Sequence, residues 1–141
     1  MIRVWLWAVA LSLPNLAAGQ PSSATVCELQ TRPSEFAQRM VTVRAVVVGR
    51  SPITIFDFDS PGCTGQLRVD VPSSSKGLNG VRLERDESFA KFEKALRERT
   101  RITATFTGLF EYEAKGRRFK MRILLQKVSA VDVQRAPSVD R

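Results

Sequence analysis

The amino-acid sequence predicts a mainly β protein: a five-stranded Greek-key barrel with one α-helix between strands three and four and a short helical cap at the N-terminus. Two observations carry this prediction. Five segments between residues 41 and 133 alternate in side-chain character with a period of two, which is typical of half-buried strands. Residues 87–99 instead repeat their apolar positions at three- and four-residue steps, as an amphipathic helix does.

The first nineteen residues have the pattern of a signal peptide. Arg3 precedes the apolar run Val4–Leu13, and Ala17 and Gly19 supply the small residues of a cleavage site. An uncleaved anchor is the weaker alternative, because a hydrocarbon core takes about twenty apolar helical residues. We therefore expect cleavage after Gly19 and an exported protein, periplasmic or secreted, with no membrane span in its mature form.

The mature chain is long enough for one hydrophobic core. We expect an OB-fold-like domain over residues 20–134 and a flexible tail over residues 135–141. The sequence has 22 Lys and Arg against 14 Asp and Glu, a net charge of +8, which falls to about +7 when Arg3 is removed. This surplus favours contact with anionic partners and does not bear on the fold.

Cys27 and Cys63 are the two cysteines of the sequence. An even pair in an exported protein usually forms a disulfide. A reactive or metal-binding pair is the alternative, but the spacing is not Cys-x-x-Cys and the sequence contains no His. We expect a disulfide that joins the N-terminal segment to the loop after the second strand.

The first half of the chain predicts the cap and three strands. Residues 20–24 are polar and expected to be loose, and the cap follows as a helical turn over Val26–Gln30 and a second turn led by Pro33. Apolar alternation then predicts strands over residues 41–48, 53–58 and 67–71.

The second half predicts a flexible loop, the helix and a hairpin. Pro72–Gly80 is rich in serine and glycine, and Asp86 suits the N-cap of the helix that follows. Strands are expected over residues 102–110 and over 119–125, the latter restarting through 128–133.

Three strands, a helix and a two-stranded hairpin are the connectivity of the OB-fold. Five short motifs spread over nearly the whole mature chain add to this pattern: Cys27-Glu28-Leu29, Pro33-Ser34-Glu35-Phe36, Val41-Thr42-Val43-Arg44, Pro61-Gly62-Cys63 and Thr107-Gly108-Leu109-Phe110. With these motifs the chain resembles a family of small exported bacterial OB-fold-like proteins of uncharacterised function. Such proteins often carry Gly-Lys before the first strand and a glycine within it, where this chain has Gln38-Arg39 and Ala45. The resemblance implies a fold and a compartment but no activity.

Few residues of the sequence suit catalysis. Asp57 and Asp59 could serve a metal or an acid–base pair, but two aspartates at a strand end are more often solvated turn formers. Gly77 and Gly80 lack the lysine–serine ending of a phosphate-binding loop. We therefore predict a non-enzymatic protein with no catalytic residues, no metal site and no cofactor.

Binding is the stronger prediction, because OB barrels bind ligands across strands two and three and the flanking loops. We favour an anionic ligand or an envelope protein as partner, bound through the basic hairpin. The alternative is a single-stranded nucleic acid or an oligosaccharide on the barrel face, with an aromatic ring stacking a base. Export separates the protein from most nucleic acid, and the rings could instead be buried. The candidate ligand-binding residues are Arg50, Thr54, Phe56, Phe58, Arg68, Lys115, Arg117, Arg118, Lys120 and Arg122.

Overall fold

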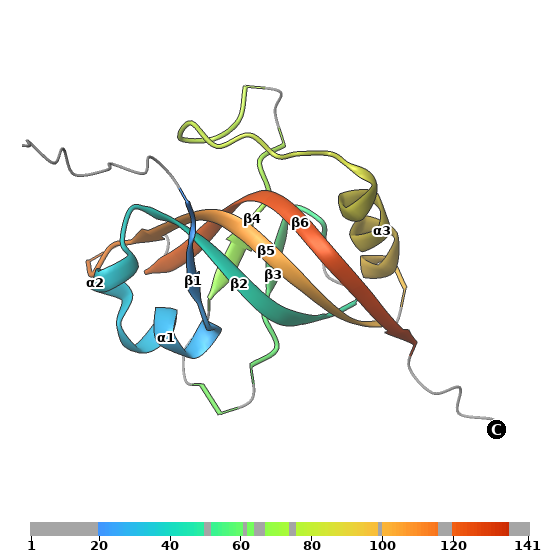
Figure 1. Cartoon of the computed structure of the whole chain (residues 1–141), viewed down its shortest axis with the longest axis horizontal. Helices are drawn as coiled ribbons and strands as arrows, with labels where there is room; N and C mark the ends of the chain where they lie inside the picture. The colour runs from blue at the N-terminus through green and yellow to red at the C-terminus, as the bar shows by residue number, and fades with distance from the viewer. Residues whose placement is uncertain are drawn as a thin grey trace, which may run out of the picture.

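The computed structural model describes residues 20–49, 52–60, 62–63, 67–73, 76–98, 100–115 and 120–135. These residues form a six-stranded sheet and three helices, so the mainly β prediction is confirmed (Figure 1). The elements in chain order are β1 (Ser22–Ala24), α1 (Val26–Thr31), α2 (Pro33–Phe36), β2 (Arg39–Val48), β3 (Ile55–Asp57), β4 (Arg68–Asp70), α3 (Glu87–Leu96), β5 (Thr100–Tyr112) and β6 (Met121–Arg135).

The strand order in the sheet is β1-β2-β5-β6-β4-β3. The long strands β2, β5 and β6 pair antiparallel, β4 runs parallel to β6, and β3 is antiparallel to β4. The five predicted strands correspond to β2 through β6, and α3 lies between β4 and β5 as predicted. The predicted closed barrel is not confirmed, because among the described residues the sheet is open, with β1 and β3 at its two edges.

The expectation of a loose segment at residues 20–24 is wrong. Ser22–Ala24 form β1, which pairs in parallel with Val41–Val43 of β2. A strand pairs through backbone amides and carbonyls that every residue here carries, so its two serines do not prevent the pairing. Thr25 follows directly and caps α1, its Oγ1 accepting a hydrogen bond from the Glu28 N–H at 3.1 Å. The short strand therefore fixes where the chain begins its first helix.

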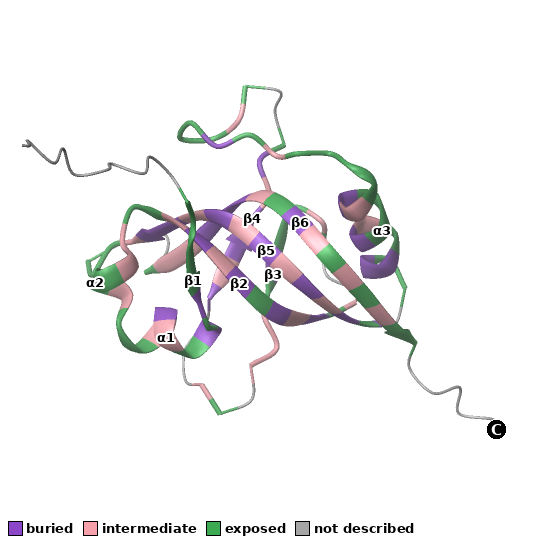
Figure 2. Cartoon of the chain, in the orientation of Figure 1, coloured by how far each residue is buried: buried purple, intermediate pink, exposed green. Residues whose placement is uncertain are grey.

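The side chains that β2 and β5 direct to the same buried face of the sheet form the centre of the core. Figure 2 shows buried positions alternating with more exposed ones along both strands, the period of two that the sequence predicts. Burying an aliphatic or aromatic side chain of this kind contributes about 1.5–3 kcal/mol. The buried residues of these two strands include Val41, Val43, Val47, Ile102, Ala104, Phe106 and Phe110.

Helix α3 covers the core at one end of the sheet (Figure 1). Asp86 caps it as predicted, its Oδ1 accepting a hydrogen bond from the Phe89 N–H at 2.9 Å. The Phe92 ring packs against the rings of Phe56 and Phe106, with centroid distances of 5.3 and 5.4 Å. The buried residues of α3 are Phe89, Phe92, Ala95 and Leu96.

Strand β6 is one continuous strand, where the sequence predicts two segments. The β5–β6 register shifts twice, between Thr103 and Thr105 and between Thr107 and Gly108. Such bulges bend a strand without ending it. The strand runs to Arg135, which pairs with Thr100, although the sequence places Arg135 in the flexible tail. The rest of that tail, residues 136–141, lies outside the described residues.

A disulfide joins Cys27 of α1 to Cys63, which follows β3, and the two Cα atoms are 5.5 Å apart. This confirms the predicted bridge. The predicted helical turns at the N-terminus are also present, as α1 and α2. Helix α1 buries Val26 and Leu29 in the main core, so the bridge ties a packed helix to the segment after β3.

Gln38, just before β2, has a φ of 59°. This left-handed conformation is disfavoured for residues with a side chain and readily adopted by glycine. The Gln38 N–H donates to the Phe110 carbonyl at 2.8 Å, which fixes the turn at the start of the β2–β5 pairing.

Candidate anion-binding site

The two predicted stacking rings pack within the protein. Phe56 is 2% exposed, and its ring centroid lies 5.3 Å from that of Phe92 and 5.8 Å from that of Phe106. Phe58 is half-buried, with its ring centroid 5.0 Å from that of Phe106. Phe56 therefore has no face open to a ligand, and Phe58 is held against the core.

Three of the remaining predicted ligand-binding residues are exposed. Thr54 lies beside β3, and Lys115 and Lys120 lie near the turn of the β5–β6 hairpin, after β5 and before β6. Within the described part of the chain, neither lysine has an ion-pair partner. Arg50, Arg117 and Arg118 lie outside the described residues.

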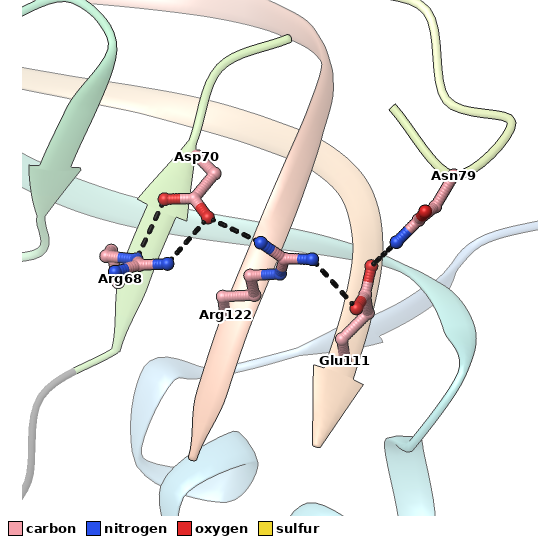
Figure 3. A network of polar contacts seen from close by, with 5 residues as sticks. All are labelled: Arg68, Asp70, Asn79, Glu111 and Arg122. Atoms are coloured by element: carbon pink, nitrogen blue, oxygen red, sulfur yellow. Dashed lines mark hydrogen bonds and ion pairs between the residues drawn. The ribbon is translucent and has the colours of Figure 1, made fainter. Parts of the chain in front are cut away.

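Arg68 and Arg122 belong to an internal network of charges (Figure 3). Arg122 donates from Nη1 to Asp70 Oδ2 at 3.0 Å and from Nη2 to Glu111 Oε2 at 3.2 Å. Arg68 meets the same Asp70 carboxylate, Nε to Oδ1 at 2.8 Å and Nη2 to Oδ2 at 2.9 Å. Asn79 donates from Nδ2 to Glu111 Oε1 at 3.1 Å. The network therefore pairs two arginines with two carboxylates.

Arg122, Asp70 and Glu111 are largely buried, Arg68 is half-buried, and the two arginines balance the two carboxylates, so the network is a structural feature of the sheet. The Arg122 side chain is 14% exposed and that of Glu111 is 8% exposed. Removing one partner of a buried pair leaves an uncompensated charge, which is strongly destabilising. Asp70 lies two residues from Arg68 on the same strand, so that pair is local in sequence. The partners of Arg122 could not be found locally, because β-pairing brings them together: Arg122 is the Cα partner of both Arg68 and Glu111.

The segment between β4 and α3 covers part of the sheet beside this network. The Glu84 N–H donates to the Gln126 carbonyl of β6 at 2.7 Å, and Asn79 holds Glu111 of β5. Val81 of the segment and Leu124 of β6 are both buried. The surface next to Arg122 is therefore occupied by the chain itself.

Asp57 and Asp59, the two aspartates near the end of β3, lie in different settings. Asp57 is exposed. Asp59 pairs through Oδ2 with Arg101 Nη1 at 2.9 Å, and its N–H donates to the Val46 carbonyl of β2 at 2.8 Å. Among the residues that the structure describes, no three His, Cys, Asp or Glu side chains are grouped so as to hold a metal ion.

A pocket of about 290 Å³ lies between α3 and the end of β6, and we call it the α3–β6 pocket. Lys94 and Ala95 follow Lys91 by three and four positions and therefore lie on the same side of α3 as Lys91, and Glu98 follows just after the helix ends. On β6 they are two positions apart and share one face of the strand. The pocket is lined by Lys91, Lys94, Ala95, Glu98, Val133 and Arg135.

The α3–β6 pocket carries a positive charge surplus. Its three cations, Lys91, Lys94 and Arg135, are opposed by one carboxylate, Glu98, which leaves a net charge of +2. In the described ranges, none of these four side chains has an ion-pair partner within 4.0 Å. Lys91, Lys94 and Arg135 are all exposed, and none of the three is among the candidate ligand-binding residues predicted from the sequence. The alternation of Val131, Val133 and Arg135 could have indicated that the last strand continues to Arg135 and directs it to the same face as Val133.

A second hollow of about 290 Å³ lies beside the disulfide. Its two charged groups already have partners: Arg44 Nη1 donates to Thr105 Oγ1 and to the Ala130 carbonyl, both at 3.1 Å, and Asp59 pairs with Arg101. It offers no charge surplus, so the α3–β6 pocket is the better anion site. The lining residues of this second hollow are Thr25, Val26, Cys27, Arg44, Ala45, Val46, Asp59, Ser60 and Cys63.

No protein-family model matches this chain, and no curated protein matches its sequence. Within the described residues, no helix combines the length and apolar character that a bilayer crossing requires. The geometry and charge of the chain itself are thus what point to a function.

Proposed function

We propose that this protein is a non-enzymatic, exported OB-type module that binds an anionic ligand or partner at the α3–β6 pocket. The observation that carries the proposal is the meeting of Lys91, Lys94 and Arg135 around one hollow. A recess with a surplus of one sign of charge raises the local concentration of ligands of the opposite sign. The net charge of the full sequence is +8, and the surplus of about +7 that remains without Arg3 attracts the same ligands at longer range.

Three features support the OB-type assignment. The OB-fold is a partly open Greek-key barrel of five strands, and β2 to β6 have the required connectivity with α3 between the third and fourth of them. The parallel pairing of β4 with β6 folds the first half of the chain back against the hairpin. The hydrogen bond from Asp59 to Val46 connects the segment after β3 to β2, where a barrel would close.

Two features support export. Arg3, the apolar run Val4–Leu13 and the small residues Ala17 and Gly19 have the pattern of a cleaved signal. The Cys27–Cys63 disulfide is of a kind that persists in oxidising compartments and is rare in the cytosol.

Binding of a single-stranded nucleic acid or an oligosaccharide on the barrel face has less support. Its stacking ring, Phe56, is in the core, and two of its arginines, Arg68 and Arg122, are paired with carboxylates. Charge then remains as the main attraction for a ligand on that face, and carboxylates already occupy two of its arginines. In the α3–β6 pocket the cations have no such carboxylate partners among the described residues.

The experiment that tests the proposal is a titration with polyphosphate at several salt concentrations. Counterion release makes log K fall linearly with log salt, and three contacts of the strength found with nucleic acids predict roughly a 20- to 40-fold loss between about 50 and about 200 mM salt. The test variant changes Lys91, Lys94 and Arg135 to Gln. The matched control changes Lys76, Lys115 and Lys120 to Gln, which removes the same charge from three exposed lysines outside the pocket.

We expect the pocket variant to lose most of the affinity and its salt dependence, while the control keeps both. Equal losses in the two variants would show attraction by total charge alone and would overturn the pocket as the site. A loss confined to the control variant would place binding on the lysines outside the pocket, the basic hairpin among them.

A further inference from the structure

We propose that the α3–β6 pocket recognises a phosphomonoester group, an inference that rests on the proposed anion-binding function and names its ligand. Three properties of the pocket support this inference: the fixed positions of its cations, its net charge of +2, and its volume with the remaining lining residues.

The cations come from two elements that the core holds in fixed relation. Lys91 and Lys94 stand on α3, whose residues Phe92, Ala95 and Leu96 are buried in the core. Arg135 stands on β6, where backbone pairing with Thr100 of β5 holds it. The Lys91 Nζ also donates to the Val131 carbonyl at 3.1 Å, which ties the helix to the strand across the pocket. One ammonium is thus positioned before any ligand arrives, so less side-chain entropy is lost on binding.

The charge of the pocket matches a dianion. Three cations and Glu98 leave +2, and a phosphomonoester carries about −1.5 to −2 at pH 7. A single carboxylate or a phosphodiester carries only one negative charge and would leave the pocket half neutralised. The Arg135 guanidinium adds a planar fork of donors that fits two phosphate oxygens at once. Charge and donor geometry therefore favour a monoester over a diester.

The carboxyl end of α3 opposes an anion, because helix carbonyls carry partial negative charge there. In this chain two of those carbonyls, of Lys94 and Ala95, accept hydrogen bonds. The Ala95 carbonyl accepts hydrogen bonds from Thr100 Oγ1 at 2.7 Å and from the Glu98 N–H at 3.1 Å, and the Lys94 carbonyl accepts from the Arg97 N–H at 3.2 Å. These donors offset part of the carbonyl dipoles, and the surplus of +2 from the lining side chains opposes what remains.

The pocket also has room and a second recognition group. A volume of about 290 Å³ is near the lower end of small-ligand pockets, which begin at about 300 Å³. Ala95 and Val133 provide an apolar floor, and Glu98 on the rim can accept a hydrogen bond from a ligand hydroxyl. A hydroxyl-bearing monoester, free in solution or as a lipid headgroup, satisfies all of these groups.

The test is a titration of the full mature protein followed by amide chemical shifts, with inorganic phosphate, glycerol 3-phosphate and dimethyl phosphate as probes. We expect saturable shifts at Lys91, Lys94 and Arg135 with the first two probes and roughly tenfold weaker binding of the diester, in line with its missing charge. Lys94→Gln and Arg135→Gln should each weaken glycerol 3-phosphate binding about three- to tenfold. Lys120→Gln, on the hairpin, should leave it unchanged.

Vesicles distinguish the two sources of the same group. Binding to vesicles that contain phosphatidic acid, but not to vesicles of phosphatidylcholine alone, would identify a lipid headgroup, whereas binding of glycerol 3-phosphate without vesicle binding would identify a soluble ligand. Equal binding of monoester and diester, or shifts away from the pocket, would overturn the inference. Polyphosphate binding at the pocket without binding of either monoester would overturn the phosphomonoester inference and leave the proposed anion-binding function standing. Failure of polyphosphate to bind at the pocket would remove the proposed function as well.

Discussion

Glu111 of β5 and Arg122 of β6 lie directly opposite each other in the sheet and form a buried ion pair, Oε2 to Nη2 at 3.2 Å. The same guanidinium reaches Asp70 of β4, so one arginine connects three strands. A parallel strand pair and an antiparallel pair meet at this residue. The network therefore fixes how the two halves of the chain come together.

Arg122→Ala should destabilise the protein by about 3–5 kcal/mol, because Glu111 and Asp70 would remain buried without their shared cation. Urea unfolding measures the loss. Arg97→Ala is the matched control, since Arg97 forms an exposed ion pair with Glu93 on α3 that is worth at most about 1 kcal/mol. A cost for Arg122→Ala no larger than that of the control would contradict the structural role of the network.

Gly108→Ala should cost roughly 1–3 kcal/mol. Gly108 lies in β5, and an added Cβ would overlap the Leu124 carbonyl and come within 2.7 Å of Ile123 Cγ2. The backbones of β5 and β6 would have to separate, and overpacking of this kind is destabilising. Thermal unfolding followed by circular dichroism measures the cost. A variant as stable as the parent chain would show that the strands can separate freely at this point.

Gln38→Gly should stabilise the protein by about 0.5–1 kcal/mol. The φ of 59° at Gln38 costs a residue with a side chain more than it costs glycine, and the N–H bond to Phe110 is kept. Ala130→Gly, at a φ of 49°, should act in the same direction. Denaturant midpoints of both variants measure the effect, and a loss of stability in both would contradict the left-handed geometry.

Replacing Cys27 and Cys63 together by alanine should cost about 3–4 kcal/mol, since the bridge closes a loop with a sequence separation of 36 and restricts the unfolded chain. Unfolding of the parent protein with and without reductant gives a second estimate of the same quantity. Denaturation midpoints that are unchanged in both experiments would show that the packing of α1 is sufficient without the bridge.

Regular alternation and capping made much of the fold predictable. The period of two in residues 41–48 and 102–110 placed β2 and β5, and Asp86 placed the start of α3. The helix face with Phe89 and Phe92 was predictable because both spacing and residue type point to a core. Strand β1 escaped prediction because three residues show no periodicity and their pairing uses only backbone groups.

The binding site was less predictable because it depends on contacts distant in sequence. Arg122 has no acidic residue close to it in the sequence, and β-pairing brings Asp70 and Glu111 to it, whereas Asp70 is only two residues from Arg68 on the same strand. Phe56 reads equally well as an exposed or a buried ring on a strand of three residues. Arg135 meets the lysines of α3 only because β6 continues through its bulges to the end of the sheet.

The most direct measurement of the central claim is a map of amide chemical shifts during a titration of the full mature protein with polyphosphate. Anion binding at the α3–β6 pocket predicts saturable shifts centred on Lys91, Lys94, Glu98 and Arg135, which weaken as salt is raised. Shifts centred on Lys115 and Lys120 of the hairpin, with none at the pocket residues, would contradict it.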